Sequence, residues 1–285
     1  KGELEEEIFL STYICHPSMA NDQLSGICVT TFLADWLRKK ENRKYSYRII
    51  FIPETIGSIV YLSKNLDLMK KNIIAGFNVA CVGDEKNYSY LPSRNGNTLS
   101  DNIAKHILKH IDKNYAIFKW SDRGSDERQY CAPNIDLPVA SIMRSKYDFY
   151  KEYHTSLDDL ENVVTEKGLE GGYEVIRLAI EALENNSYPK ITVLGEPQMG
   201  KRELFPAIMD LNCINKDSKE GRRKFINNKN KLSYYLLMMN LISWSDGKHS
   251  LLEIAEICEA PIWELYPMIE ILKSQKLIQL NNKPF

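Results

Sequence analysis

Apolar residues in the longer, N-terminal part of the chain form short continuous runs that alternate with segments of helical spacing. The runs are rich in β-branched and aromatic residues, which is typical of buried strands. They lie at residues 8–15, 45–52, 73–82, 88–91 and 137–143. Helical spacing begins at Ile27 and recurs over 56–69, 99–114 and 165–185. This alternation predicts an α/β fold whose mixed, largely parallel sheet is covered by helices on both faces.

The pattern changes after Ser187, where proline and glycine become frequent and a basic, polar stretch follows. Three stretches of helical spacing and one strand-like run come next, at 231–244, 251–259, 262–275 and 277–280. Helix, turn, helix and a trailing strand predict a small winged-helix-like domain. We therefore divide the chain into an α/β domain, a linker with a polar loop and a winged-helix-like domain, at 1–187, 188–230 and 231–285.

The last predicted helix of the small domain lacks the basic face that a DNA-reading helix needs. It carries Trp263, Glu264, Tyr266 and Glu270, with Lys273 near its end. The formal net charge of the whole chain is −1, which gives no overall field for holding nucleic acid. We therefore expect this domain to contact a protein partner or a second copy of the chain, and favour this over DNA binding.

The composition is that of an ordinary globular protein, with 44% hydrophobic and 26% charged residues. No apolar run approaches the roughly 20 residues of a membrane-spanning helix. The six cysteines are scattered without a CxxC pair, which indicates reduced thiols in a cytoplasmic protein. The chain begins with Lys1 rather than Met, almost inside its first predicted strand, so we expect an upstream segment to be missing.

Polar residues follow the ends of four predicted strands. His16 follows the first, with Asp22 after a short loop, while Glu54 follows the second. Asp84 follows the third, and His154 lies in the loop after the last. Because parallel strands end at the same edge of a sheet, these side chains are expected to converge. Two imidazoles and a carboxylate suit zinc and leave a position open for water, from which Glu54 would take a proton.

Each of these residues also has a purely structural explanation. His16 and His154 can be hydrogen-bonded structural histidines. Asp22 can be a turn or N-cap residue, and Glu54 can cap the helix that follows it. Asp84 lies in a Gly-Asp turn, which needs no function. Their joint occurrence at strand ends favours the metal site.

Several short stretches carry a family resemblance. They are His16, the loop Asn-Asp-Gln-Leu-Ser-Gly at 21–26, Pro-Glu at 53–54 with Gly-Ser at 57–58, and Tyr-His-Thr-Ser-Leu-Asp at 153–158. On these stretches the chain resembles the co-catalytic zinc aminopeptidases, which include carboxypeptidase and glutaminyl cyclase relatives, from about Glu6 to Ser187. With its tail, the chain is similar to a bacterial group of polysaccharide-biosynthesis proteins with an aminopeptidase-like domain, in which more sequence usually precedes that domain.

The resemblance implies a role for each matching residue. His16 would bind one zinc, His154 a second, and the carboxylate of Asp22 would lie between them. Glu54 takes the position of the general base. The resemblance also implies a cis peptide bond between Asp22 and Gln23.

Two departures from the family pattern concern the metal ligands. Thr55 stands where the family has a second, zinc-binding glutamate, and 78–80 reads Asn-Val-Ala where the family has Asn-Leu-Asp. Asp84 lies slightly beyond and is a candidate substitute. If two metal ions were bound, each would still have one ligand that the sequence does not supply with certainty. We therefore favour a single zinc held by the two histidines and Asp22 over a dinuclear site.

A charged run at 124–130 aligns loosely with the Ser-Asp-His substrate loop of these peptidases. Asp126, Glu127 and Arg128 are therefore candidates to contact an amine or a carboxylate of the substrate. Arg144 is a further candidate partner for an anion. The alternative is a charged surface loop without such a role.

These observations together predict a zinc-dependent hydrolase of the aminopeptidase type, in which metal-activated water attacks an amide bond of a peptide or small-molecule substrate. One alternative keeps the metal but changes the reaction to that of an amidase or cyclase acting on an amino sugar or other small amide in polysaccharide biosynthesis. Another is a non-catalytic scaffold that retains the fold, which the two departures would explain.

Overall fold

The computed structural model describes residues 1–202, 204 and 233–284, so Cys213 and the predicted polar loop lie outside the described residues. The chain divides into two compact units, Lys1–Glu184 and Asn185–Phe285. Every helix among the described residues is too short or too polar to cross a membrane.

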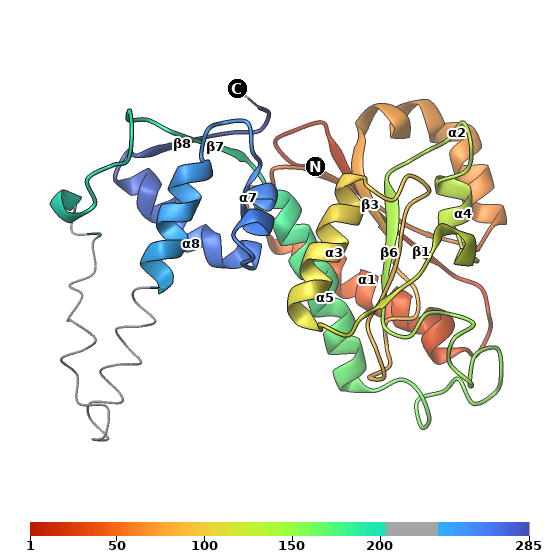
Figure 1. The fold of residues 1–285 in the computed structure, drawn as a ribbon. Coiled ribbons are helices and arrows are strands. Elements are labelled where there is room, and N and C mark those ends of the chain that lie inside the picture. The colour runs from red at the N-terminus through yellow and green to blue at the C-terminus, as the bar shows by residue number, and fades with distance from the viewer. Residues whose placement is uncertain (203, 205–232, 285) are drawn as a thin grey trace, which may run out of the picture. The chain divides into compact units, whose positions relative to one another are not determined.

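The first unit is built on a six-stranded sheet of order β2-β1-β3-β6-β4-β5 (Figure 1). Its strands are β1 Glu7–Tyr13, β2 Ser46–Ile52, β3 Ile73–Asn78, β4 Ser89–Leu91, β5 Ala116–Ile117 and β6 Val139–Met143. Strand β1 pairs in parallel with β2 and β3, and β3 pairs in parallel with β6. Strand β4 runs antiparallel to β6 and parallel to β5. The prediction of a mixed, largely parallel sheet is confirmed.

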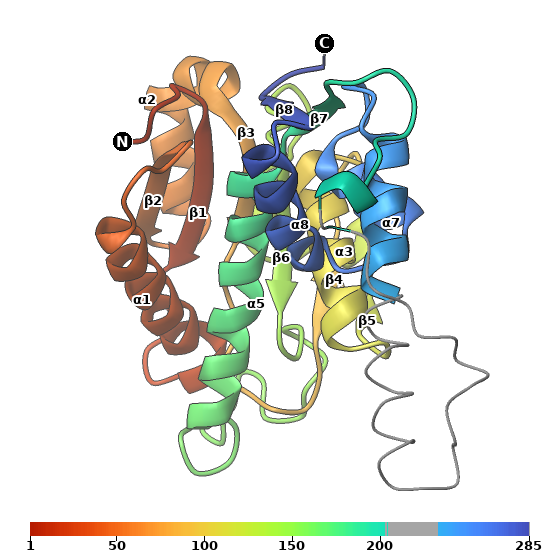
Figure 2. The same cartoon turned by 90° about the vertical axis from the view of Figure 1, so that its left-hand side faces the viewer.

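Helices cover both faces of this sheet (Figures 1 and 2). They are α1 Ser25–Lys39, α2 Ile56–Asn72, α3 Leu99–Ile111, the short α4 Glu127–Tyr130 and α5 Glu166–Asn185. Leu62 and Met69 of α2 share one buried cluster with Phe9 of β1 and Tyr130 of α4. The Phe9 and Tyr130 rings meet edge to face with centroids 5.0 Å apart. This apolar contact fixes α2 and α4 over one face of the sheet.

Glycines let α5 approach the segment that follows β3. A Cβ atom at Gly168 would lie 2.0 Å from the carbonyl oxygen of Gly83, and one at Gly172 would lie 2.2 Å from that of Val82. No side chain fits at such distances, so glycine is required where the helix passes this backbone. The close packing holds the 82–84 segment beside the carboxyl ends of the strands.

The strand predicted over 73–82 is shorter in the structure, because β3 ends at Asn78. The amide of Val79 still donates to the carbonyl oxygen of Ser11, but Cys81 has a φ of 51°. A left-handed residue cannot continue a strand, although its apolar neighbours fit the pattern of one. The apolar run therefore continues as buried loop.

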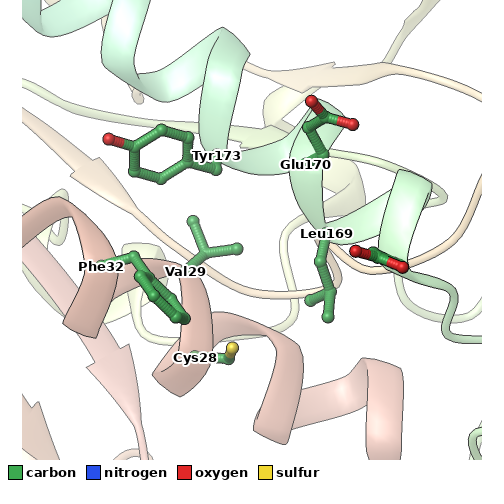
Figure 3. A pocket seen from close by; sticks show the side chains of 7 residues that line it. Cys28, Val29, Phe32, Leu169, Glu170 and Tyr173 are labelled. Atoms are coloured by element: carbon green, nitrogen blue, oxygen red, sulfur yellow. The ribbon is translucent and has the colours of Figure 1, made fainter.

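Helices α1 and α5 lie side by side and form an apolar groove of about 260 Å³. Figure 3 shows Leu169 and Tyr173 of α5 facing Cys28, Val29 and Phe32 of α1. The groove shares no lining residue with the candidate metal ligands described below.

The second unit contains helical residues 233–244, α7 Leu251–Ile257, α8 Ile262–Ser274 and a small sheet. In this sheet β7 Tyr188–Ile191 pairs antiparallel with β8 Ile278–Asn281. The first residues of the predicted linker thus form a strand. Local sequence did not show this because the pairing partner lies at the other end of the unit.

Candidate metal centre

His16, Asp22 and His154 converge at the carboxyl end of the sheet, as their positions after strand ends predicted. Asp22 lies in a short turn, Ala20–Leu24, between β1 and α1. Its Oδ2 atom is 3.0 Å from Nε2 of His154 and 3.9 Å from Nε2 of His16. One ligand atom from each of the three residues lies within 4.8 Å of the others, which is a grouping that can hold a metal ion.

The hydrogen bonds of Asp22 support a cation at this point. Its side chain is 2% exposed, and burial raises its pKa. Oδ1 accepts from the hydroxyl of Tyr13 at 2.5 Å and from the thiol of Cys81 at 3.6 Å. Oδ2 has no hydrogen-bond partner among the described residues, although two imidazoles lie beside it. An unpaired buried carboxylate oxygen is unfavourable, and a metal ion would satisfy it.

The distances also fit coordination by one ion. With metal–ligand bonds of about 2.0–2.1 Å at tetrahedral angles, ligand atoms lie roughly 3.3–3.4 Å apart. The distances of 3.0 and 3.9 Å from Oδ2 of Asp22 lie on either side of this value. His154 stacks on the ring of Tyr153 with centroids 3.8 Å apart, and 47% of its side chain is exposed. The site is therefore open to solvent on the His154 side.

Left-handed backbone conformations occur at several residues of the site. The φ angles are 39° at His16, 62° at Thr55 and 53° at His154. Such conformations are uncommon for residues other than glycine and often mark functional sites. The turn after Asp22 is also irregular, with a φ of 154° at Gln23. The structure contains no cis peptide bond among the described residues, so the expected cis bond between Asp22 and Gln23 is wrong.

The carboxylate of Asp158 connects the loop of His154 to the loop of Asp22. Its Oδ1 accepts from the amide of Asn21 at 2.7 Å, and its Oδ2 accepts from the amide of Asp22 at 3.0 Å and from the hydroxyl of Tyr150 at 2.9 Å. Asp158 is fully buried. The motif included Asp158, but sequence reasoning gave it no role, because hydrogen bonds to a distant loop leave no local signal.

Glu54 lies beside the three candidate ligands. Its Oε2 atom is 4.0 Å from Nε2 of His16, and 19% of its side chain is exposed. Thr55 is the N-cap residue of α2 and makes no side-chain cap, so Glu54 does not cap this helix. The Thr55 amide donates instead to Oδ1 of Asp126 at 2.7 Å, which fixes the backbone next to Glu54.

Cys15 also belongs to the site, although sequence reasoning did not select it. Its Sγ atom is 2.8 Å from Nδ1 of His16 and 3.8 Å from Oε2 of Glu54. Burial raises the pKa of the Cys15 thiol to about 11. The only signal in the sequence was its position next to a candidate ligand.

The structure does not place Asp84 among the ligand atoms. Both of its oxygens accept hydrogen bonds, from the side chain of Asn21 and from the amides of Lys86 and Ser145. The hydroxyl of Ser145 donates a further one at 2.7 Å. Asp84 therefore stabilises the loops next to the site, and no oxygen is left free to replace a missing ligand.

The four candidate substrate-binding residues lie in different surroundings. Glu127 is buried and accepts from two backbone amides, the hydroxyl of Tyr147 and the side chain of Asn78. Arg144 donates to the carbonyl oxygen of Asp84 and lies over the ring of Tyr88. The side chains of Glu127 and Arg144 therefore make their contacts within the protein and stabilise the fold.

Asp126 and Arg128 lie next to Glu54. Asp126 is buried, and its Oδ1 accepts from the Thr55 amide and from the Ser58 hydroxyl, while its Oδ2 has no partner among the described residues. Arg128 is exposed, and its guanidinium donates to the hydroxyl of Thr55 at 2.7 Å. Of the four, Arg128 is the one that presents a charge to solvent beside Glu54.

Comparison with known proteins gives two family matches. The model of a family described as a domain of unknown function (DUF4910) matches residues 1–186, and a winged helix-turn-helix model matches residues 186–280. A Clostridium acetobutylicum protein, described as a candidate polysaccharide biosynthesis protein with an aminopeptidase-like domain, is 41% identical over 256 residues. These residues are 90% of this chain and 54% of the relative.

Solved structures have the same fold. The crystal structure of a candidate peptidase from Clostridium acetobutylicum has a TM-score of 0.82 at 38% identity, over 98% of this chain and 58% of that chain. A zinc aminopeptidase from Bacillus subtilis has a TM-score of 0.53 at 16% identity, over 64% of this chain and 47% of that chain, which shows the fold alone. The chain thus spans little more than half the length of its Clostridium relatives, and the aminopeptidase-like fold and winged helix are confirmed.

We predict that Asp158→Asn lowers the free energy of unfolding by about 1–3 kcal/mol, because an amide NH₂ group would face at least one of the donors that now bond to the carboxylate. Urea-induced unfolding measures this. Glu161→Gln is the matched control, because it removes the same charge from an exposed side chain of the same loop. Equal stability of the two variants would contradict the role given to Asp158.

We predict a pH-dependent effect of Asp126→Asn. Burial raises the pKa of Asp126 to about 6 from 3.8, so the folded protein binds this proton more tightly than the unfolded chain. The resulting stability is present below pH 3.8 and is lost as the pH rises through 6. The free energy of unfolding of the variant, relative to that of the wild type, should therefore rise by about 2 kcal/mol between pH 4 and pH 8. Urea unfolding at both pH values tests this, and a difference that does not change with pH would contradict it.

Proposed function

Because the chain belongs to the DUF4910 family and has an aminopeptidase-like fold, we propose that it is a zinc-dependent amide hydrolase of the aminopeptidase type. The observation that carries this proposal is the buried Oδ2 atom of Asp22, which lies between the imidazoles of His16 and His154 and accepts no hydrogen bond among the described residues. Glu54 lies beside them with a partly exposed carboxylate.

One zinc ion would be held by Nε2 of His16, Oδ2 of Asp22 and Nε2 of His154. When bound, zinc supplies Lewis acidity, which polarises a carbonyl and makes water a better nucleophile. Both imidazoles lie nearest the same oxygen of Asp22, while the other oxygen accepts from Tyr13. A carboxylate that bridged two ions through its two oxygens would lose the hydrogen bond from Tyr13, so this hydrogen bond supports one ion.

Glu54 would act as the general base. Its carboxylate accepts a proton from the water that attacks the amide carbonyl carbon, and then gives this proton to the departing nitrogen as the C–N bond breaks. The side chain is suited to this because it is partly exposed and lies 4.0 Å from a candidate ligand nitrogen. Glu54 also has no capping role that would occupy it.

Arg128 supports a substrate with an anionic group near the scissile bond. Its exposed guanidinium is held by the Thr55 hydroxyl, next to Glu54, and no ion pair to Arg128 occurs among the described residues. A guanidinium has five donors and pairs well with carboxylate or phosphate. We therefore propose Arg128, rather than Glu127 or Arg144, as the substrate-binding member of the four candidates.

A second candidate function follows from the description of the curated relative as a polysaccharide biosynthesis protein. The same residues would then hydrolyse an amide on an amino sugar or another small amide. Aminoacyl anilides and N-acylated amino sugars, assayed side by side, distinguish the two candidates. A chain that binds zinc but hydrolyses neither would support the non-catalytic alternative.

We also propose a cellular compartment and a type of binding partner. The five described cysteines carry free thiols, which supports a reducing, cytoplasmic environment. In the winged helix, α8 carries Glu264 and Glu270, and Lys273 pairs with Glu270 at 2.8 Å. This acidic character supports a protein partner or a second copy of the chain rather than DNA.

We predict one zinc per chain in the untagged, dialysed protein, measured by elemental analysis. His16→Ala and His154→Ala should each lose this zinc, because two protein ligands remain. His249→Ala is the matched control, because it removes an imidazole that bonds to Asp246 in the second unit, and it should keep the zinc. Two zinc ions per chain, or zinc retained by both site variants, would contradict the proposal.

We predict that Glu54→Gln lowers kcat on a hydrolysed amide by at least about 100-fold, which is the usual contribution of a general base. Zinc content should not change, since Glu54 is not a proposed ligand. Glu161→Gln controls for the lost charge and should keep wild-type kcat. Full activity of Glu54→Gln with zinc still bound would falsify the general-base role.

A further inference from the structure

The imidazole of His16 has different partners at its two nitrogens. Nε2 faces Oδ2 of Asp22, with Oε2 of Glu54 at 4.0 Å. Nδ1 faces Sγ of Cys15 at 2.8 Å. The Cys15 thiol also reaches Oε2 of Glu54 at 3.8 Å, so one side chain contacts both a candidate ligand and the candidate base.

The short distance from Cys15 to His16 indicates a hydrogen bond rather than two ligands of one ion. With zinc bonds of about 2.3 Å to sulfur and 2.0–2.1 Å to nitrogen, two tetrahedral ligands lie roughly 3.5 Å apart. The observed separation is 2.8 Å. In addition, Nε2 is the nitrogen of His16 that faces Asp22, so Nδ1 is free to hydrogen bond.

The direction of this hydrogen bond decides whether His16 can bind a metal. A neutral imidazole carries one N–H and one lone pair. If Nδ1–H donates to the sulfur, the lone pair is on Nε2 and points to the metal position. If the thiol donated to Nδ1, the proton would be on Nε2 and ligation would be blocked. Oε2 of Glu54 is an alternative acceptor for the thiol proton, which leaves the sulfur to accept from His16.

We propose that Cys15 is a positioning residue for the metal centre, which holds the ring of His16 in the tautomer that leaves Nε2 free to bind the ion. This inference rests on the proposed zinc site. A ligating histidine normally gives its other N–H to a carboxylate, a carbonyl or water, and loss of such a partner costs about 10–100-fold in metal affinity. Here a thiol has this role and links His16 to Glu54.

Zinc affinity of the untagged full chain, measured by competition with a chromophoric chelator, tests the proposal. Cys15→Ala should bind zinc at least about 10-fold more weakly, because Nδ1–H loses its acceptor. Cys15→Ser should stay much closer to wild type, because a hydroxyl can accept from Nδ1–H and donate to Glu54. Cys28→Ala is the matched control, because it removes a half-buried thiol from the groove between α1 and α5 (Figure 3), and its affinity should not change.

Three results would overturn the inference. The first is wild-type affinity in Cys15→Ala, and the second is equal weakening in the Ala and Ser variants. The third is a thiolate-to-metal charge-transfer band in the Co²⁺-substituted protein that disappears in Cys15→Ala, because the sulfur would then be a ligand. Absence of zinc from the wild-type chain would instead refute the proposed function, so the two failures can be told apart.

Discussion

The hydrogen bonds of the Asp158 carboxylate hold the candidate site together. His154 is carried by a loop without regular secondary structure, and Asp22 lies in an irregular turn far away in the sequence. Asp158 accepts from the amides of Asn21 and Asp22, and its carbonyl oxygen accepts from the amide of Ala20. Charge-assisted bonds of this kind are strong when buried. The distance between the imidazole of His154 and Asp22 therefore depends on a residue that would not itself contact a metal.

Hydrogen-bonding groups lie at or next to the two positions at which the chain departs from the aminopeptidase pattern. At the first, Thr55 bonds to Asp126 through its amide and accepts from Arg128 through its hydroxyl. At the second, Ala80 is followed by Cys81, whose thiol donates to Oδ1 of Asp22. The hydrogen bonds of Thr55 and Cys81 stabilise the surroundings of the three candidate ligands. Thr55 also holds the guanidinium of Arg128 close to Glu54.

Much of the site could be predicted because the topology of a parallel sheet determines where polar residues at strand ends lie. This reasoning brought His16, Asp22, Glu54 and His154 to one edge, and the structure places them there. It could not assign Asp84, which also follows a strand, because hydrogen bonds to Ser145 and Asn21 depend on distant backbone. The contact of Cys15 with His16 occurs where His16 has a left-handed φ, and β7 depends on pairing with β8. Such features come from long-range contacts, which sequence periodicity does not record.

Hydrogen bonding separates the buried carboxylates near the site into two kinds. In Asp84, Glu127 and Asp158 both oxygens accept hydrogen bonds, so these carboxyl groups are satisfied without any ligand. In Asp22 and Asp126 one oxygen accepts no hydrogen bond among the described residues. The raised pKa of Asp126, about 6, means that this carboxyl takes up a proton readily in weak acid. Asp22 differs because two imidazole nitrogens face its free oxygen. A cation shared with these nitrogens satisfies all three groups at once, which a single proton on the carboxylate does not.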